Sequence, residues 1–341
     1  MVLQTYKGHP STTVYHRKPL VGSDNPNILL FIPGNPGLIE FYITYLELIQ
    51  KQFPEFEVFA VGHAGYQTTD VSLSNNQSPT EFKYYDLQYQ INHKYEIFKT
   101  FILQRYDETE TEVNLYFLSH SMGSYICQRV TKRLLDCGIL YGKFNIRFSG
   151  LICPTIMDIA KSDNGVKFDK LFTYLPFITM LLWFAWLLDV FLTDSTKKRI
   201  IKTKFINVPP TTDLDDPRVV ESIDNSVAGI FNMVKSSRII RQALTMAQQE
   251  LQEILTESSM NDWYFSNSKN VWAFFAPYDY WVHNSTRDYL LEKYHNLQEN
   301  IRFEIGNDPD PITHSFCVHQ SVRFAEITIQ RMNEFFPSGI P

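Results

Sequence analysis

The stretch LSHSMGSY at residues 118–125 decides the fold of this chain of 341 residues. It ends the apolar run 113–121, and an apolar run that stops at small residues is typical of a buried strand turning sharply into a helix. Hydrolases that present a nucleophilic serine on such a turn usually show G-x-S-x-G; here Ser119 replaces the first glycine. Ser121 is therefore a candidate nucleophile, and a serine that caps the helix is the structural alternative.

Five further short apolar runs end at turn residues in the same way. Two segments between them, residues 41–53 and 86–106, carry apolar residues at helical spacing. Strands that alternate with helices predict an α/β fold, with a mostly parallel sheet and helices on both faces. The five runs are residues 27–33, 55–65, 144–154, 270–277 and 301–306.

The gap between the runs 144–154 and 270–277 is more than a hundred residues long. One crossover connection in a compact domain is far shorter. We therefore predict a core formed by residues 1–154 and 266–341, with residues 155–265 inserted as a helical cap.

Composition excludes several classes of protein. The net charge of -6 and the pI near 5.9 argue against nucleic acid as the main partner. Four widely scattered cysteines favour buried thiols over a disulfide frame or a zinc site. The first twenty residues show no apolar core after a basic start, so we expect no signal peptide. No dinucleotide, P-loop or metal-ligand motif is visible, so we expect neither cofactor nor metal.

Residues 171–192 are the most apolar part of the chain, and three interpretations remain open. The stretch 171–188 has no charge, which is the lower limit for a transmembrane helix, but Pro176 interrupts it. A buried cap helix would be equally apolar. Trp183, Trp186 and the five basic residues within 197–204 favour instead a segment that lies in one leaflet of a lipid surface.

A nucleophilic serine needs a histidine base and a carboxylate that orients the base. In sheets of this kind the chain order is serine, acid, histidine, with the acid and the histidine on loops after late strands. Asp279 follows the strand 270–277, and His314 follows the strand 301–306. The order Ser121, Asp279, His314 therefore follows from their placement.

Competing residues exist for two of these roles. His283 lies near a helix start and His319 in the last helix, where both suit structural positions. Asp308 and Asp310 share the loop of His314, and Asp158 follows the strand 144–154, where some hydrolases carry the acid.

Two backbone N–H groups should bind the oxyanion. One belongs to the residue after the nucleophile, Met122, and the other to a loop after an early strand. That loop is PGNPG at residues 33–37, in which Asn35 offers the N–H. We interpret His63 and His120 as structural residues.

Several motifs together resemble one family. FIPGNPG followed by EFY, then GHAG, LSHSMGSY, CPTIMDIAKSDNG and a late D-x-W-V are similar to the lipid droplet-associated hydrolases, over about residues 27–336. The resemblance implies an α/β-hydrolase fold, location at lipid droplets and the endoplasmic reticulum, and a catalytic set matching Ser121, Asp279 and His314. It also implies neutral-lipid esters as substrates. Ser119 is a departure, because relatives typically carry glycine there.

The leading hypothesis is a serine esterase or lipase that works through an acyl-enzyme at lipid droplets, with an endoplasmic reticulum or cytosolic pool. The alternative is a droplet-surface binding protein with little or no activity on the same fold. A Pro-broken apolar hairpin at 171–192 would let the chain enter and leave a droplet monolayer on one side.

Overall fold

A computed structural model describes residues 3–6, 12–67, 84–256, 259–295, 297, 301–307 and 311–340. In these residues eight strands form one sheet in the order β1-β2-β4-β3-β5-β6-β7-β8. All six predicted strands are present and pair in parallel. They are β3 (Asn27–Ile32), β4 (Phe56–Val61), β5 (Val113–His120), β6 (Phe144–Ile152), β7 (Val271–Phe275) and β8 (Ile301–Ile305).

Two strands at one edge of the sheet were not predicted. β1 (Leu3–Tyr6) and β2 (Thr12–Arg17) run antiparallel to each other, and β2 runs antiparallel to β4. The sequence TTVYHR of β2 is polar at both ends, so it lacks the apolar run that marks the central strands. Its place at the edge of the parallel strands explains the mixed composition.

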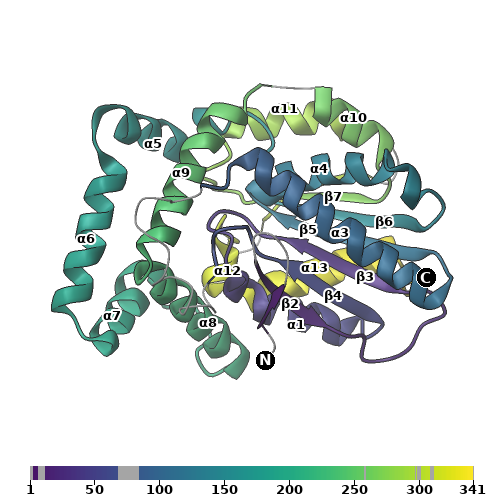
Figure 1. The fold of residues 1–341 in the computed structure, drawn as a ribbon, viewed down its shortest axis with the longest axis horizontal. Coiled ribbons are helices and arrows are strands. Elements are labelled where there is room, and N and C mark those ends of the chain that lie inside the picture. Colours follow the sequence, from purple (N-terminus) through teal and green to yellow (C-terminus); the bar gives the residue numbers. More distant parts are fainter. Residues whose placement is uncertain are drawn as a thin grey trace.

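Helices cover both faces of the sheet, as predicted (Figure 1). Successive residues of β3 alternate between two cores: Leu29 and Phe31 face one, and Leu30 and Ile32 face the other. The first core is closed by α1 (Ile43–Gln52), α12 (Phe316–His319) and α13 (Ser321–Phe335). The second is closed by α3 (Leu87–Thr109), α4 (Met122–Leu135), α10 (Ser259–Asn267) and α11 (Asn284–Tyr294).

Apart from α10, which packs on the sheet, the chain between β6 and β7 is mostly helical and lies beyond the carboxyl ends of the parallel strands (Figure 1). Its helices besides α10 are α5 (Asp163–Tyr174), α6 (Phe177–Phe191), α7 (Asp194–Ile200), α8 (Pro217–Val234) and α9 (Ser237–Glu253). Short 3₁₀ segments are η1 (Ile39–Tyr42), η2 (Gly138–Leu140) and η3 (Ile159–Lys161), and η4 (Ile201–Ile206) is a π-helix.

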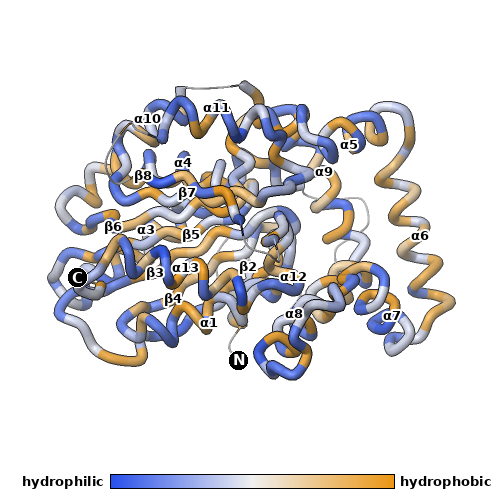
Figure 2. The backbone as a smooth tube through the Cα atoms, turned by 180° about the vertical axis from the view of Figure 1, so that it is seen from behind, coloured by the Kyte–Doolittle hydropathy of each residue, from blue (hydrophilic) through white to orange (hydrophobic). Residues whose placement is uncertain are grey.

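The helix α6 lies at the outer edge of the molecule, and most of its residues are hydrophobic (Figure 2). None of its residues is buried, so the interpretation as a buried cap helix is wrong. Trp183 and Trp186 are 63% and 55% exposed. α6 therefore offers an apolar surface to the outside.

The joint between α5 and α6 is a right-angle bend rather than a hairpin. The two axes meet at 92°, with Pro176 at the break. Within the described residues, neither α5, α6 nor any other single helix has the length and hydropathy of a membrane span, and only this bent pair passes such a test together.

One of the five basic residues within 197–204 is part of the internal structure. Lys197 is buried, and its ammonium group binds the carboxylates of Asp189 and Asp194 at 2.6 and 3.0 Å. It joins the end of α6 to α7. Arg199 and Lys204, by contrast, are exposed.

Gly123 lets the start of α4 approach the end of β3. A Cβ atom at this position would lie 2.4 Å from the carbonyl oxygen of Ile32 and 2.5 Å from that of Pro33. Both contacts are with backbone atoms, which cannot turn aside. The glycine therefore fixes the distance between the helix and the strand beside Ser121.

We predict that Gly123→Ala lowers the free energy of unfolding by about 1–3 kcal/mol, because the added methyl group overpacks the contact with β3. Urea unfolding measures the change. Gly138→Ala is the matched control, since a Cβ there meets nothing within 4 Å. Equal stabilities of the two variants would contradict the packing argument.

Candidate active site

Ser121 occupies a strained turn between β5 and α4. Its backbone has φ 52° and ψ -126°, a conformation that residues other than glycine rarely adopt. The Ser121 N–H donates to the carbonyl of Ile152 at 2.9 Å, and its carbonyl accepts from Ser124 N–H at 2.9 Å. A nucleophile elbow has this geometry.

Ser119 is accommodated without opening the elbow. The residue is fully buried, and its hydroxyl lies 3.3 Å from the carbonyl oxygen of Gly150 and 3.2 Å from the Ser124 hydroxyl. A serine therefore replaces the usual glycine with its hydroxyl paired.

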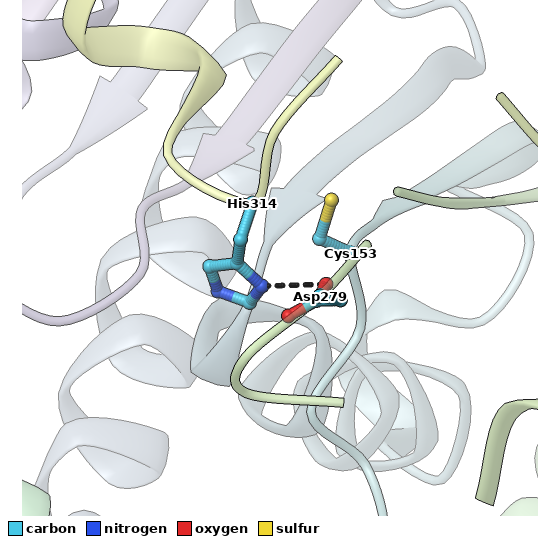
Figure 3. A group of neighbouring side chains, drawn as sticks. All are labelled: Cys153, Asp279 and His314. Carbon is cyan, nitrogen blue, oxygen red and sulfur yellow. Dashed lines mark hydrogen bonds and ion pairs between the residues drawn. The ribbon is translucent and has the colours of Figure 1, made fainter. Parts of the chain in front are cut away.

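The structure brings Ser121, His314 and Asp279 into one chain of hydrogen bonds. His314 Nε2 lies 2.9 Å from Ser121 Oγ, and His314 Nδ1 lies 2.8 Å from Asp279 Oδ2. Figure 3 shows the imidazole and the carboxylate edge to edge. An Nδ1–H that donates to Asp279 leaves Nε2 as the acceptor for the serine proton, which is the arrangement that general-base activation requires.

The loop after β7 holds Asp279 in its charged form. Asp279 Oδ1 accepts from the N–H groups of Trp281 at 2.8 Å and Val282 at 3.1 Å. Burial raises the pKa of Asp279, but the charge and hydrogen bond of His314 and the two N–H groups outweigh burial and leave the pKa below its usual value. The carboxylate is ionised at neutral pH and can stabilise an imidazolium.

The competing residues lie elsewhere. Asp158 binds Thr256 and Lys161, not a histidine. His283 is the exposed N-cap of α11, with its ring bonded to Ser285, and His319 ends α12.

Two of the predicted alternatives cannot be placed. Asp308 and Asp310 fall outside the described residues. Among the candidates with described positions, only His314 and Asp279 join Ser121.

The loop 33–37 lies directly against the nucleophile. A Cβ atom at Gly34 would lie 3.0 Å from Ser121 Cβ, so a glycine before Asn35 favours this close approach. Met122 is the first residue of α4, and its N–H has no partner four residues earlier in the helix. The two predicted oxyanion donors thus belong to segments that flank Ser121.

His120 does more than pack in the elbow, because both of its ring nitrogens bond to other parts of the site. Nε2 lies 2.9 Å from the carbonyl oxygen of His314, and Nδ1 lies 2.8 Å from the Tyr42 hydroxyl. That hydroxyl also accepts from Gly34 N–H at 3.3 Å. Burial, with the neighbouring charge of His314, lowers the pKa of His120 to about 3. A neutral histidine thus connects the loop of His314 to the loop 33–37.

Sequence reasoning missed the role of Tyr42. The only signal was its place in EFY, which follows PGNPG in the chain. His63 is buried, its backbone N–H donates to the Gly37 carbonyl at 3.2 Å, and a Cβ atom at Gly37 would lie 2.5 Å from its ring.

Cys153 lies beside the acid and the base (Figure 3). In the part of the chain that the structure describes, Cys153, Asp279 and His314 form the one group whose possible metal-ligand atoms lie within 4.8 Å of one another. Metals bind the thiolate, but burial and the charge of Asp279 raise the pKa of Cys153 well above its usual value. The group therefore suits a hydrogen-bonded catalytic pair with a neutral thiol beside it.

Comparison with known proteins adds a family to this geometry. A family model described as lipid-droplet associated hydrolase matches residues 25–317. Lipid droplet-associated hydrolases of Rattus norvegicus and Mus musculus are 30% and 27% identical to the chain, over 48% and 51% of it. The alignments cover 47% and 52% of those proteins, so the chain spans about half the length of the curated relatives it matches.

Solved structures support the fold. The chain resembles 2-hydroxy-6-oxo-6-phenylhexa-2,4-dienoate hydrolase from a Rhodococcus species, with a TM-score of 0.53, 11% identity and coverage of 95% of both chains. At this identity the likeness concerns the fold alone. It confirms the predicted α/β-hydrolase fold.

We predict that Tyr42→Phe lowers the free energy of unfolding by about 1–3 kcal/mol, because Gly34 N–H and His120 Nδ1 lose a buried partner. Urea unfolding measures the loss. Tyr141→Phe, at a tyrosine that is 91% exposed, should leave stability unchanged. An unchanged urea midpoint for Tyr42→Phe would show that the hydrogen bonds of the Tyr42 hydroxyl do not stabilise the fold.

Proposed function

The chain belongs to the lipid-droplet associated hydrolase family, and we propose that it is a serine hydrolase of neutral-lipid esters, triacylglycerols or sterol esters, at the surface of lipid droplets. The observation that carries the proposal is the hydrogen-bonded chain of Ser121, His314 and Asp279 at a strained elbow. The family supports hydrolysis, and this geometry supports acyl transfer through a serine.

The first half of the reaction forms an acyl-enzyme. Ser121 Oγ attacks the ester carbonyl carbon while His314 Nε2 takes the hydroxyl proton, and Asp279 stabilises the imidazolium. The carbonyl oxygen becomes an oxyanion that accepts hydrogen bonds from the N–H groups of Asn35 and Met122. The carbon–oxygen bond to the alcohol then breaks, and His314 returns the proton to the leaving alkoxide.

The second half repeats the sequence with water. His314 takes a proton from water as its oxygen attacks the acyl carbon, the oxyanion forms again, and the bond to Ser121 breaks. His314 gives the proton back to Ser121 Oγ, and a fatty acid leaves. No cofactor or metal takes part in these steps.

We predict that Ser121→Ala and Asp279→Asn each lower kcat by at least about 10⁴-fold, since serine catalysis fails without the nucleophile or the correct histidine tautomer. Release of fatty acid from a triacylglycerol emulsion and of nitrophenol from p-nitrophenyl butyrate measures the loss. His283→Ala is the control, because that histidine caps α11 on the surface.

The outcome separates the two candidate functions. Hydrolysis that is lost in both variants supports the enzyme. A folded wild type without activity on any ester would instead favour a droplet-surface binding protein on the same fold.

The lipid surface would be met by the predicted cap, residues 155–265, and above all by α6. Its outward side carries exposed Met180, Trp183, Phe184 and Leu187. Exposed Arg199 and Lys204 follow shortly after α6, where lipid headgroups would be reached. The proposal places the chain on droplets, with an endoplasmic reticulum or cytosolic pool when it is not bound there.

We predict that Trp183→Ser, Phe184→Ser and Leu187→Ser combined weaken binding to artificial droplets at least about tenfold, because three exposed apolar side chains no longer enter the monolayer. Flotation with triolein droplets coated in phosphatidylcholine measures binding. The matched control changes Leu135, Ile139 and Tyr141 to serine, three exposed apolar residues away from α6. Equal flotation of both triple variants would contradict a role of α6 as the lipid contact.

A further inference from the structure

A carboxylate from the predicted cap reaches the loop beside Ser121. Glu250 lies near the end of α9 and is only 5% exposed. The one hydrogen bond that it makes to a described residue is with the side-chain amide of Asn35, whose Nδ2 donates to Glu250 Oε1 at 2.8 Å. The bond joins residues 215 positions apart in the chain.

The other polar atoms of the Asn35 side chain are also bonded. Nδ2 donates to the carbonyl of Ala243 at 3.0 Å, and Oδ1 accepts from the Tyr66 hydroxyl at 3.0 Å. Two of these three bonds come from α9. The side chain of Asn35 is therefore held by α9 and Tyr66, while Gly34, its neighbour, lies against Ser121.

A buried glutamate at position 250 lowers the stability of the fold. Burial raises the pKa of Glu250 to about 7, and the hydrogen bond of Asn35 only partly opposes the shift. A buried carboxylate with one hydrogen bond stabilises a protein less than an apolar residue of the same size would. Its presence points to a role in the site rather than in stability.

We propose that Glu250 is a positioning residue of the hydrolase, which acts through the side-chain amide of Asn35 to hold the loop 33–37 beside Ser121. The proposal rests on the proposed function, in which the Asn35 N–H binds the oxyanion. Oxyanion donors stabilise the transition state only at hydrogen-bond distance from the developing charge. A small shift of this loop therefore lowers kcat. Because the donor acts on the oxyanion and not on the bound ester, KM should change little.

The test compares kcat and KM for p-nitrophenyl butyrate in three variants. Glu250→Leu should lower kcat about ten- to a hundredfold with KM nearly unchanged, since one displaced oxyanion donor costs up to about 10²–10³. Glu250→Gln keeps an oxygen for Asn35 and should restore kcat to within about threefold of the wild type, a rescue that a purely structural role of the charge would not give. Glu253→Leu, an exposed glutamate of the same helix, is the matched control.

The variant Asn35→Ala tests the proposal independently, because it keeps the backbone N–H but removes the side-chain amide that binds Glu250. It should lower kcat as Glu250→Leu does, and the double variant should lose no more than either single one. Should Glu250→Leu fail to fold, an unchanged kcat in Asn35→Ala overturns the proposal by itself.

Two failures are distinguishable. An active wild type whose kcat is unchanged in Glu250→Leu, or losses that simply multiply in the double variant, would overturn the role of Glu250 alone. A folded wild type without esterase activity would overturn the proposed function and this inference with it.

Discussion

The positive φ of Ser121 is the constraint on which the rest of the site depends. A residue with a side chain holds this conformation only where its surroundings compensate for the strain. Here the carbonyl of Ile152 binds its N–H, and Gly123 allows α4 to meet the end of β3. This conformation places the Ser121 hydroxyl within hydrogen-bond distance of His314. Gly34 of the loop 33–37 also lies close to Ser121.

The ionisable groups around Ser121 differ in charge because their surroundings differ. Asp279 has two N–H donors and a histidine, so it remains charged although it is buried. His120 and Cys153 are equally buried, and burial keeps both neutral. Asp279 is therefore the carboxylate that binds His314 among the described residues. Neutral His120 is free to bond the backbone of the His314 loop and the Tyr42 hydroxyl.

The sequence predicts those parts of this protein that leave a local pattern. Buried parallel strands are continuous apolar runs, and their order along the chain places Asp279 and His314 on neighbouring loops. β2 was not predicted because it pairs antiparallel with both β1 and β4, beside the parallel strands, and its sequence TTVYHR is not a continuous apolar run. The composition of α6 also suits a core helix, and the fold rejects that alternative because none of its residues is buried. The bond between Glu250 and Asn35 leaves no local signal, since the two residues lie 215 positions apart and meet only when the helices pack.

The helix α9 connects the exposed apolar helix α6 to the site, because it packs on α6 and binds Asn35. The central claim is that His314 activates Ser121. The most direct measurement is mass spectrometry of the peptide that carries Ser121 after treatment with a fluorophosphonate, on wild type and His314→Ala. The account predicts a phosphonylated Ser121 in the wild type and none in the variant. An unmodified Ser121 in folded wild-type protein, or equal modification of both, would contradict it.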